Sequence, residues 1–90
     1  MPLFAVICRD KPDHLSVRLE TRAQHLEFLG ARDVVRMAGP LLDAGEMRGS
    51  LIVIEMGSLE DAQSWAAEDP YNAAGLFETV EVIEWKKVIG

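Results

Sequence analysis

Two short, unbroken apolar runs, residues 3–8 and 51–54, constrain the fold of this 90-residue chain more than any other feature. Each run is too short for a core helix and is bounded by polar or turn-forming residues, as buried strands are. Successive side chains alternate between the two faces of a strand, so both faces of these strands are apolar. The sequence therefore predicts strands over residues 3–8 and 50–56, in a sheet whose two faces both need cover.

The rest of the chain supplies two helices, two further strands and the turns between them. In chain order, we predict a helix over residues 15–29 that Gly30 ends, a strand over 34–42 with a break or bulge at Gly39-Pro40, a turn over 43–46, a helix over 59–69 that Ser58 caps, a loop over 72–75 and a strand over 76–88. This βαββαβ order predicts an α+β, ferredoxin-like fold, in which two helices cover one face of an antiparallel sheet. The whole chain, residues 1–90, is expected to form one domain.

One face of this sheet has no cover in the predicted arrangement. Two helices can cover only one face, whereas Leu3, Ala5 and Ile7 point one way and their alternates, Phe4, Val6 and Cys8, the other. An apolar face left in water is an association site, and a domain of this size is only marginally stable alone. We therefore expect a homodimer in which two subunits pack through their open sheet faces.

Charge and composition limit the classes of partner and the cellular compartment. The chain carries nine basic and fifteen acidic residues, a net charge of −6, which argues against nucleic acid or an anionic membrane surface as a partner. The single cysteine, Cys8, lies inside an apolar run, so we expect a buried, inert thiol and no disulfide framework. Neither a signal peptide nor an apolar stretch of membrane-spanning length is present in the sequence, and a cytoplasmic location is expected.

The carboxylate of Asp69 is placed where its charge needs a partner. Pro70 disfavours helical backbone in the residue before it, so the second helix is expected to end at Asp69. At about 100° per residue, Asp69 falls in the same sector as Ala62 and Trp65, on the side that faces the core. Burial and the negative end of the helix dipole both disfavour a charged carboxylate unless a cation or several donors meet it. The alternative is an ordinary helix end whose acid turns to water.

The first helix offers a partner for this carboxylate in His25. Its apolar positions form a leucine stripe made of Leu15, Leu19, Leu26 and Leu29. Helical spacing places His25 and Arg18 at the border of this stripe and Arg22 inside it, which makes a basic edge along the apolar face. A carboxylate from Asp69 would fix the tautomer of His25, as is usual for a general base. The alternative is that His25 is a boundary histidine and that both arginines extend their charged ends past the core to water.

A metal or phosphate site is not indicated by the residue spacing. His14 and His25 are eleven positions apart, which separates them by roughly 16 Å along a helix, too far to share one ion. No other cluster of histidine or cysteine exists in the sequence. The glycines of Gly39-Pro40 and Gly49-Ser50 lack P-loop spacing, and no helix directly follows them. We therefore expect neither a metal nor another cofactor.

Several motifs, taken in order over almost the whole chain, resemble the YciI-like family. They are Arg18, Arg22-Ala23-Gln24-His25-Leu26, Ala38-Gly39-Pro40-Leu41, Gly49-Ser50-Leu51, Asp69-Pro70-Tyr71 with Ala74-Gly75-Leu76, and the ending Trp85-Lys86-Lys87-Val88. The resemblance implies a ferredoxin-like dimeric α+β barrel. It also implies an enzyme with a His–Asp pair, and relatives of known activity include a dehydrochlorinase acting on a chlorinated hydroxyhydroquinone.

The same resemblance assigns roles to individual residues. It places the family histidine on His25 and the family aspartate on Asp69, with Arg22, Ser50 and Tyr71 lining the same pocket. The connection over residues 42–49 departs from the family pattern because it is shorter, and it would alter the rim of the pocket.

The leading hypothesis from the sequence is a cofactor-independent enzyme in which His25 is the general acid or base and Asp69 orients it. Arg22 or Ser50 would hold a polar group of a small, cyclic or phenolic substrate, in an elimination, isomerisation or hydrolysis. One alternative is a non-catalytic dimeric module that binds a small ligand in the same pocket. Another is an accessory partner of a larger enzyme with no chemistry of its own.

Overall fold

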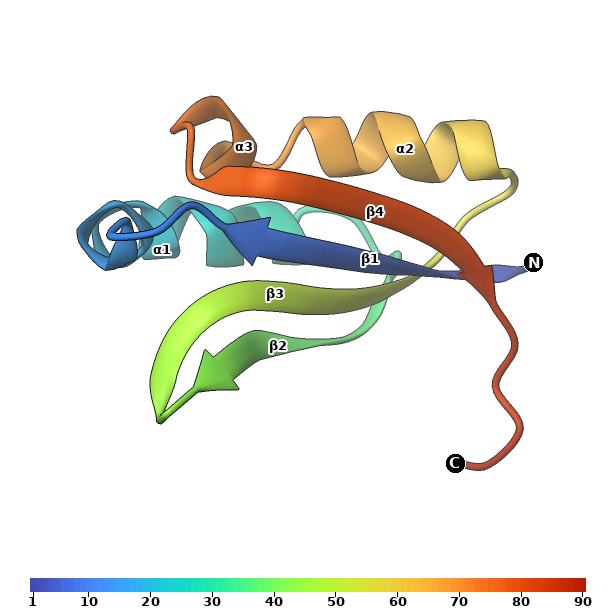
Figure 1. Cartoon of the computed structure of the whole chain (residues 1–90). Coiled ribbons are helices and arrows are strands. Elements are labelled where there is room, and N and C mark those ends of the chain that lie inside the picture. Colours follow the sequence, from blue (N-terminus) through green and yellow to red (C-terminus); the bar gives the residue numbers. More distant parts are fainter.

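The computed structural model describes all residues, 1–90, and contains a four-stranded antiparallel sheet with the helices on one face (Figure 1). In chain order the elements are β1 (Leu3–Asp10), α1 (Leu15–Gly30), β2 (Val35–Asp43), β3 (Glu46–Glu55), α2 (Leu59–Ala67), α3 (Pro70–Ala73) and β4 (Phe77–Trp85). The strands lie side by side in the order β2-β3-β1-β4. The predicted ferredoxin-like α+β class is therefore confirmed.

The β2–β3 hairpin closes through a tight turn at Ala44 and Gly45, which both have positive φ angles, 51° and 81°. Two consecutive positive values are typical of the turns that match the twist of paired strands. The predicted break at Gly39-Pro40 is wrong, because β2 runs through both residues and its register shifts lie elsewhere, before Met37 and after Leu41. Because β2 is an edge strand, the missing N–H of Pro40 can be tolerated within it.

The core lies between the helices and the sheet face formed by alternate residues of the two central strands. Its fully buried members include Phe4 and Val6 of β1, and Ile52 and Ile54 of β3. The helical layer adds other buried side chains, namely Ala62, Trp65, Ala66 and Tyr71. The apolar central strands are therefore buried on the helix side, as predicted.

The buried face of α1 differs from the predicted leucine stripe. Leu19 and Leu26 are 54% and 46% exposed, whereas Arg18 and His25 are buried. Phe28 packs on α2, with its ring 4.7 Å from that of Trp65. The buried face is thus turned from the leucine stripe by roughly 100°, the rotation of one residue. The helix is held by Val17, Phe28 and Leu29 against the core and by paired polar groups, while Leu19 and Leu26 are left exposed.

The segment around Asp69 also differs from the prediction. Ser58 caps α2 as expected, its hydroxyl accepting a hydrogen bond from the Asp61 N–H at 3.1 Å. However, α2 ends at Ala67, and Asp69 is the N-cap of a separate short helix, α3, with Pro70 in its first turn. Proline is favoured there because its missing N–H has no acceptor in a helix. The predicted loop over 72–75 therefore begins inside a helix.

The last strand is shorter than predicted. It ends at Trp85, and residues 86–90 have no regular structure. β4 pairs only with β1, and Leu3, the first residue of β1, is the partner of Trp85. A longer β4 would therefore have no strand to pair with. No helix in the structure is both long and apolar enough to cross a membrane.

Candidate functional site

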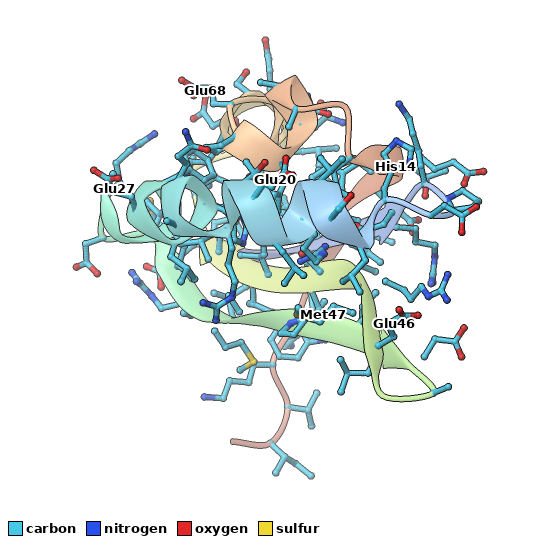
Figure 2. The ribbon with its side chains drawn as sticks, turned by 90° about the vertical axis from the view of Figure 1, so that its left-hand side faces the viewer. His14, Glu20, Glu27, Glu46, Met47 and Glu68 are labelled. Atoms are coloured by element: carbon cyan, nitrogen blue, oxygen red, sulfur yellow. The ribbon has the colours of Figure 1, made fainter.

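A cavity of about 150 Å³ lies between α1 and the β2–β3 hairpin. It is lined by Arg18, Arg22, His25, Leu26, Leu29, Ala38, Gly39, Pro40, Met47, Ser50, Ile52 and Tyr71. Figure 2 shows α1 above the hairpin, with Met47 below the helix. The predicted pocket residues Arg22, Ser50 and Tyr71 all lie on its walls.

His25 and Asp69 are hydrogen-bonded in this site. His25 Nδ1 lies 2.9 Å from Asp69 Oδ1, and both side chains are buried. An ionised carboxylate can only accept a hydrogen bond, so Nδ1 carries the proton and donates it. The predicted proximity of the two side chains is therefore confirmed, whereas a catalytic role for them stays a prediction.

The second nitrogen of His25, Nε2, is free of protein partners. Every buried side-chain nitrogen and oxygen has a hydrogen-bond partner, so Nε2 must be an accessible atom. His25 is also among the residues that line the cavity. The imidazole is thus anchored at one nitrogen and presents a lone pair at the other.

The position of Asp69 at the start of α3 explains how its charge is accommodated. Its Oδ1 also accepts a hydrogen bond from the Tyr71 N–H at 2.9 Å. The first turn of a helix offers free N–H groups and a partial positive charge. The prediction placed Asp69 at the negative end of a helix, and the break after α2 instead places it at a positive end, where a carboxylate is stabilised.

Tyr71 separates His25 from Arg18 in a three-layer stack. Its ring lies 4.0 Å from the His25 ring at an angle of 18°, and the Arg18 guanidinium lies 4.6 Å from the ring centre. Arg18 and His25 are seven positions apart, roughly 10 Å along α1, so they occupy opposite faces of the phenol ring. This stack fixes the plane of the imidazole.

The hydroxyl of Tyr71 remains protonated at neutral pH. Burial raises the pKa of Tyr71, and the nearby negative charge of Asp69 raises it further, while the charges of Arg18 and Arg22 partly offset this effect. An interaction with the Arg18 side chain also acts to lower the pKa of Tyr71, and it leaves the hydroxyl proton free to be donated. Tyr71 can therefore donate a hydrogen bond to a ligand in the cavity.

Arg18, and not Arg22, is the buried arginine of α1. Its Nε and Nη2 donate to the two carboxylate oxygens of Asp10 at 2.7 and 2.8 Å, and Nη2 also donates to Ser50 Oγ at 3.0 Å. Burial lowers the pKa of Arg18, but the hydrogen bond and the charge of Asp10 outweigh it and raise the pKa above its ordinary value. Arg22 is exposed at the cavity, contrary to its predicted place inside the apolar stripe.

Asp10, the carboxylate that pairs with Arg18, is a residue that the sequence prediction missed. The predicted strand stopped at residue 8, whereas β1 continues to Asp10. Side chains alternate along a strand, so Asp10 lies on the same face as Val6 and Cys8, toward α1. Extending this alternation two residues beyond the apolar run could have identified it.

The remaining candidates for chemistry lie outside the cavity. Burial raises the pKa of Cys8 to about 12, and the charge of Asp69 adds to this effect, so the thiol is protonated and buried as predicted. His14 Nδ1 donates to the Pro12 carbonyl at 2.8 Å at the start of α1. No three side chains of the metal-binding types gather in a geometry suited to a metal ion.

The family model of the YCII-related domain matches residues 2–86. This chain belongs to the YCII-related, YciI-like family. Protein YciI of Escherichia coli O6:H1 is 39% identical over 99 aligned positions, which cover 96% of this chain and 98% of that protein. An uncharacterised protein of Haemophilus influenzae is 34% identical, with 94% and 97% covered.

Solved structures extend the comparison of this YciI-like chain. A 5-chloro-2-hydroxyhydroquinone dehydrochlorinase, TftG, from Burkholderia phenoliruptrix AC1100 is 34% identical, with a TM-score of 0.87 and 93% of each chain covered. That structure is a complex with 2,5-dihydroxybenzoquinone. An antibiotic biosynthesis monooxygenase is only 10% identical, with a TM-score of 0.60 and 99% and 100% of the two chains covered, and therefore supports the fold alone.

Proposed function

We propose that this YciI-like protein is a small-molecule enzyme that performs acid–base chemistry with His25 and Asp69 and needs no cofactor. One observation carries the proposal: His25 lines the cavity with Nδ1 bound to buried Asp69 at 2.9 Å, while Nε2 has no partner in the protein. A general base needs a lone pair within reach of the substrate and a fixed orientation. The hydrogen bond to Asp69 and the stack on Tyr71 supply that orientation.

The proposed step begins with proton transfer to His25 Nε2. The neutral imidazole accepts a C–H or O–H proton from the substrate and becomes an imidazolium ion. Asp69 balances the new positive charge through the same hydrogen bond, which becomes an ion pair. Tyr71, Ser50 and Arg22, which line the cavity, hold the polar groups of the substrate.

Elimination is the reaction class that we place first, ahead of isomerisation and hydrolysis. The structural relative TftG is a dehydrochlorinase, and it is 34% identical over nearly the whole chain. In such a reaction, His25 would take the proton, the electrons of the broken bond would form a new double bond, and chloride would leave with the electrons of the C–Cl bond. The substrate would be a small cyclic or phenolic compound.

The alternative is a non-catalytic module that binds a small ligand in the same cavity, or an accessory partner of a larger enzyme. The observation that favours it is the apolar part of the cavity wall, which includes Leu26, Leu29 and Ile52 and would hold a ligand without chemistry. In that case the His25–Asp69 bond would serve to position α1 on α3.

We also propose that the protein is a cytoplasmic homodimer that associates through the open sheet face. Apolar side chains gather on that face without cover, among them Met37, Leu51, Ile83 and Trp85. Burial of such a surface is favourable by about 25 cal/mol for each Å² removed from water. The second subunit would complete the cover that the sheet needs.

The proposed chemistry is tested by chloride release from 5-chloro-2-hydroxyhydroquinone. His25→Asn should lower turnover by about 10²–10⁴-fold, the usual contribution of a general base. His14→Asn is the matched control, because it replaces the only other histidine and lies outside the cavity. Equal turnover in the two variants would remove His25 from the mechanism. If no variant and no wild-type sample turns over any chlorinated phenol while ligands still raise Tm, the binding-module alternative would hold.

A further inference from the structure

The cavity has a charge opposite to that of the protein. The chain has a net charge of −6, yet the cavity lining contains two arginines and one histidine and neither aspartate nor glutamate. A concave site lined by one sign of charge concentrates ligands of the other sign. The lining residues therefore favour an anionic ligand, although the net negative charge of the whole chain repels anions.

Only one of these basic groups brings a charge that no carboxylate balances. Arg18 is paired with Asp10 by a two-point contact, whereas His25 is a neutral imidazole whose hydrogen bond, together with that of the Tyr71 N–H, satisfies the carboxylate of Asp69. Arg22 makes neither an ion pair nor a side-chain hydrogen bond. Arg22 is therefore the one lining cation without a carboxylate partner, and it can pair with a single negative charge on the ligand.

The cavity volume limits the ligand to about one ring. A cavity of about 150 Å³ in a protein core is large enough to bind benzene, and the cavity here has the same volume. Half of its lining is hydrophobic, and Leu26, Leu29 and Ile52 contribute to that half. A compact apolar body with one charged group fits both the volume and the lining.

We propose that the cavity binds a small organic monoanion the size of a single six-membered ring, a carboxylate or an enolate or phenolate, whose charged oxygen is bound by Arg22. The proposal rests on the proposed function in using the same cavity, and it adds the charge and size of the ligand. The apolar ring occupies the part of the cavity lined by Leu26 and Ile52. Arg22 is then a binding residue that sets specificity for charge.

One pair of ligands and one pair of variants test this site. Benzoate and its neutral isostere benzamide are titrated into the wild type, Arg22→Gln and Arg32→Gln, with affinities and contact sites measured by NMR. Arg32 is the control, because it is also exposed and unpaired, removes the same charge and lies outside this cavity. Neither replacement touches the core, so all three proteins should fold.

We expect benzoate to shift the amide signals of Gly39 and Ser50, and to bind the wild type about tenfold more tightly than benzamide, the value of one charge-assisted hydrogen bond. Arg22→Gln should abolish this preference, and Arg32→Gln should retain it. Added salt should weaken benzoate binding in the wild type and have little effect in Arg22→Gln. The two-ring 2-naphthoate should bind more weakly than benzoate.

Several results would overturn the anion site. They are equal affinity of benzoate and benzamide for the wild type, an unchanged benzoate affinity in Arg22→Gln, benzoate shifts confined to residues outside the cavity, or no benzoate binding at millimolar concentration. These failures are separable from failure of the proposed chemistry. That chemistry depends on His25 and is measured by chloride release, whereas the anion site depends on Arg22 and is measured by affinity.

Discussion

Replacing Asp10 by asparagine should be the most destabilising exchange of a single charged side chain, because it leaves a buried guanidinium without its counter-charge. In the Arg18–Asp10 pair, the two side chains are each only 3% exposed, and their atoms lie 2.7 Å apart. Removing one partner of a buried pair costs about 3–5 kcal/mol. Asparagine keeps one acceptor oxygen, so we expect a loss of about 3 kcal/mol in the free energy of unfolding, near the lower end of that range.

The surface pair Arg48–Glu46 provides the matched control. Its atoms lie 2.8 Å apart, but its side chains are 49% and 47% exposed. Exposed pairs contribute about 0–1 kcal/mol, so Glu46→Gln should change the stability little. The two contacts have nearly the same length, and both exchanges remove one negative charge. A difference in stability loss between Asp10→Asn and Glu46→Gln therefore reports the effect of burial.

Urea unfolding followed by circular dichroism measures both variants. A chain of 90 residues has a total stability of roughly 5–13 kcal/mol, so a loss of about 3 kcal/mol from Asp10→Asn should visibly lower the transition midpoint. Replacing both partners by apolar residues, Asp10→Leu with Arg18→Met, should restore much of the loss, because no charge is then left buried. A loss for Asp10→Asn within about 0.5 kcal/mol of that for Glu46→Gln would refute the reasoning.

Three further predictions concern tautomer, pH and assembly. The His25 ring should carry its proton on Nδ1 in the wild type, and Asp69→Ala should allow the Nε2–H tautomer, as measured by ¹⁵N NMR. Because the pKa of Cys8 is about 12 in the folded state and 9.0 ordinarily, only the unfolded thiol ionises between these values. Stability should therefore fall by about 1.4 kcal/mol per pH unit above pH 9, and less in Cys8→Ala. Ile83→Lys on the open sheet face should yield a monomer by light scattering, whereas Val80→Lys, on the opposite face and similarly exposed, should not.

Each of these predictions has a result that contradicts it. An unchanged tautomer in Asp69→Ala would show that Asp69 does not hold the imidazole proton in place. Parallel pH profiles of wild type and Cys8→Ala would show that the thiol ionises in the folded state as well. A monomeric wild type at micromolar concentration, or a dimer that survives Ile83→Lys, would remove the open sheet face as the interface.

The sequence determined the elements of the fold and most of their order because these depend on local patterns. Unbroken apolar runs of strand length specify β1 and β3, and the hydroxyl of Ser58 caps α2 by a bond to a residue three positions away. It also marked His25 and Asp69 as candidates, because a polar side chain at the border of an apolar face needs a partner. Their contact across 44 positions follows once the fold brings α1 and α3 together.

Only the tertiary structure decided which face of α1 is buried and which arginine lies inside. Helical periodicity weighs side chains by hydrophobicity, and on that scale the leucines outrank Arg18 and His25. Arg18 is nevertheless buried, because Asp10 from β1 and Ser50 from β3 meet its guanidinium with three hydrogen bonds. A buried charge is stable only where partners from other elements satisfy it, and those partners are brought together by the packing of the whole chain.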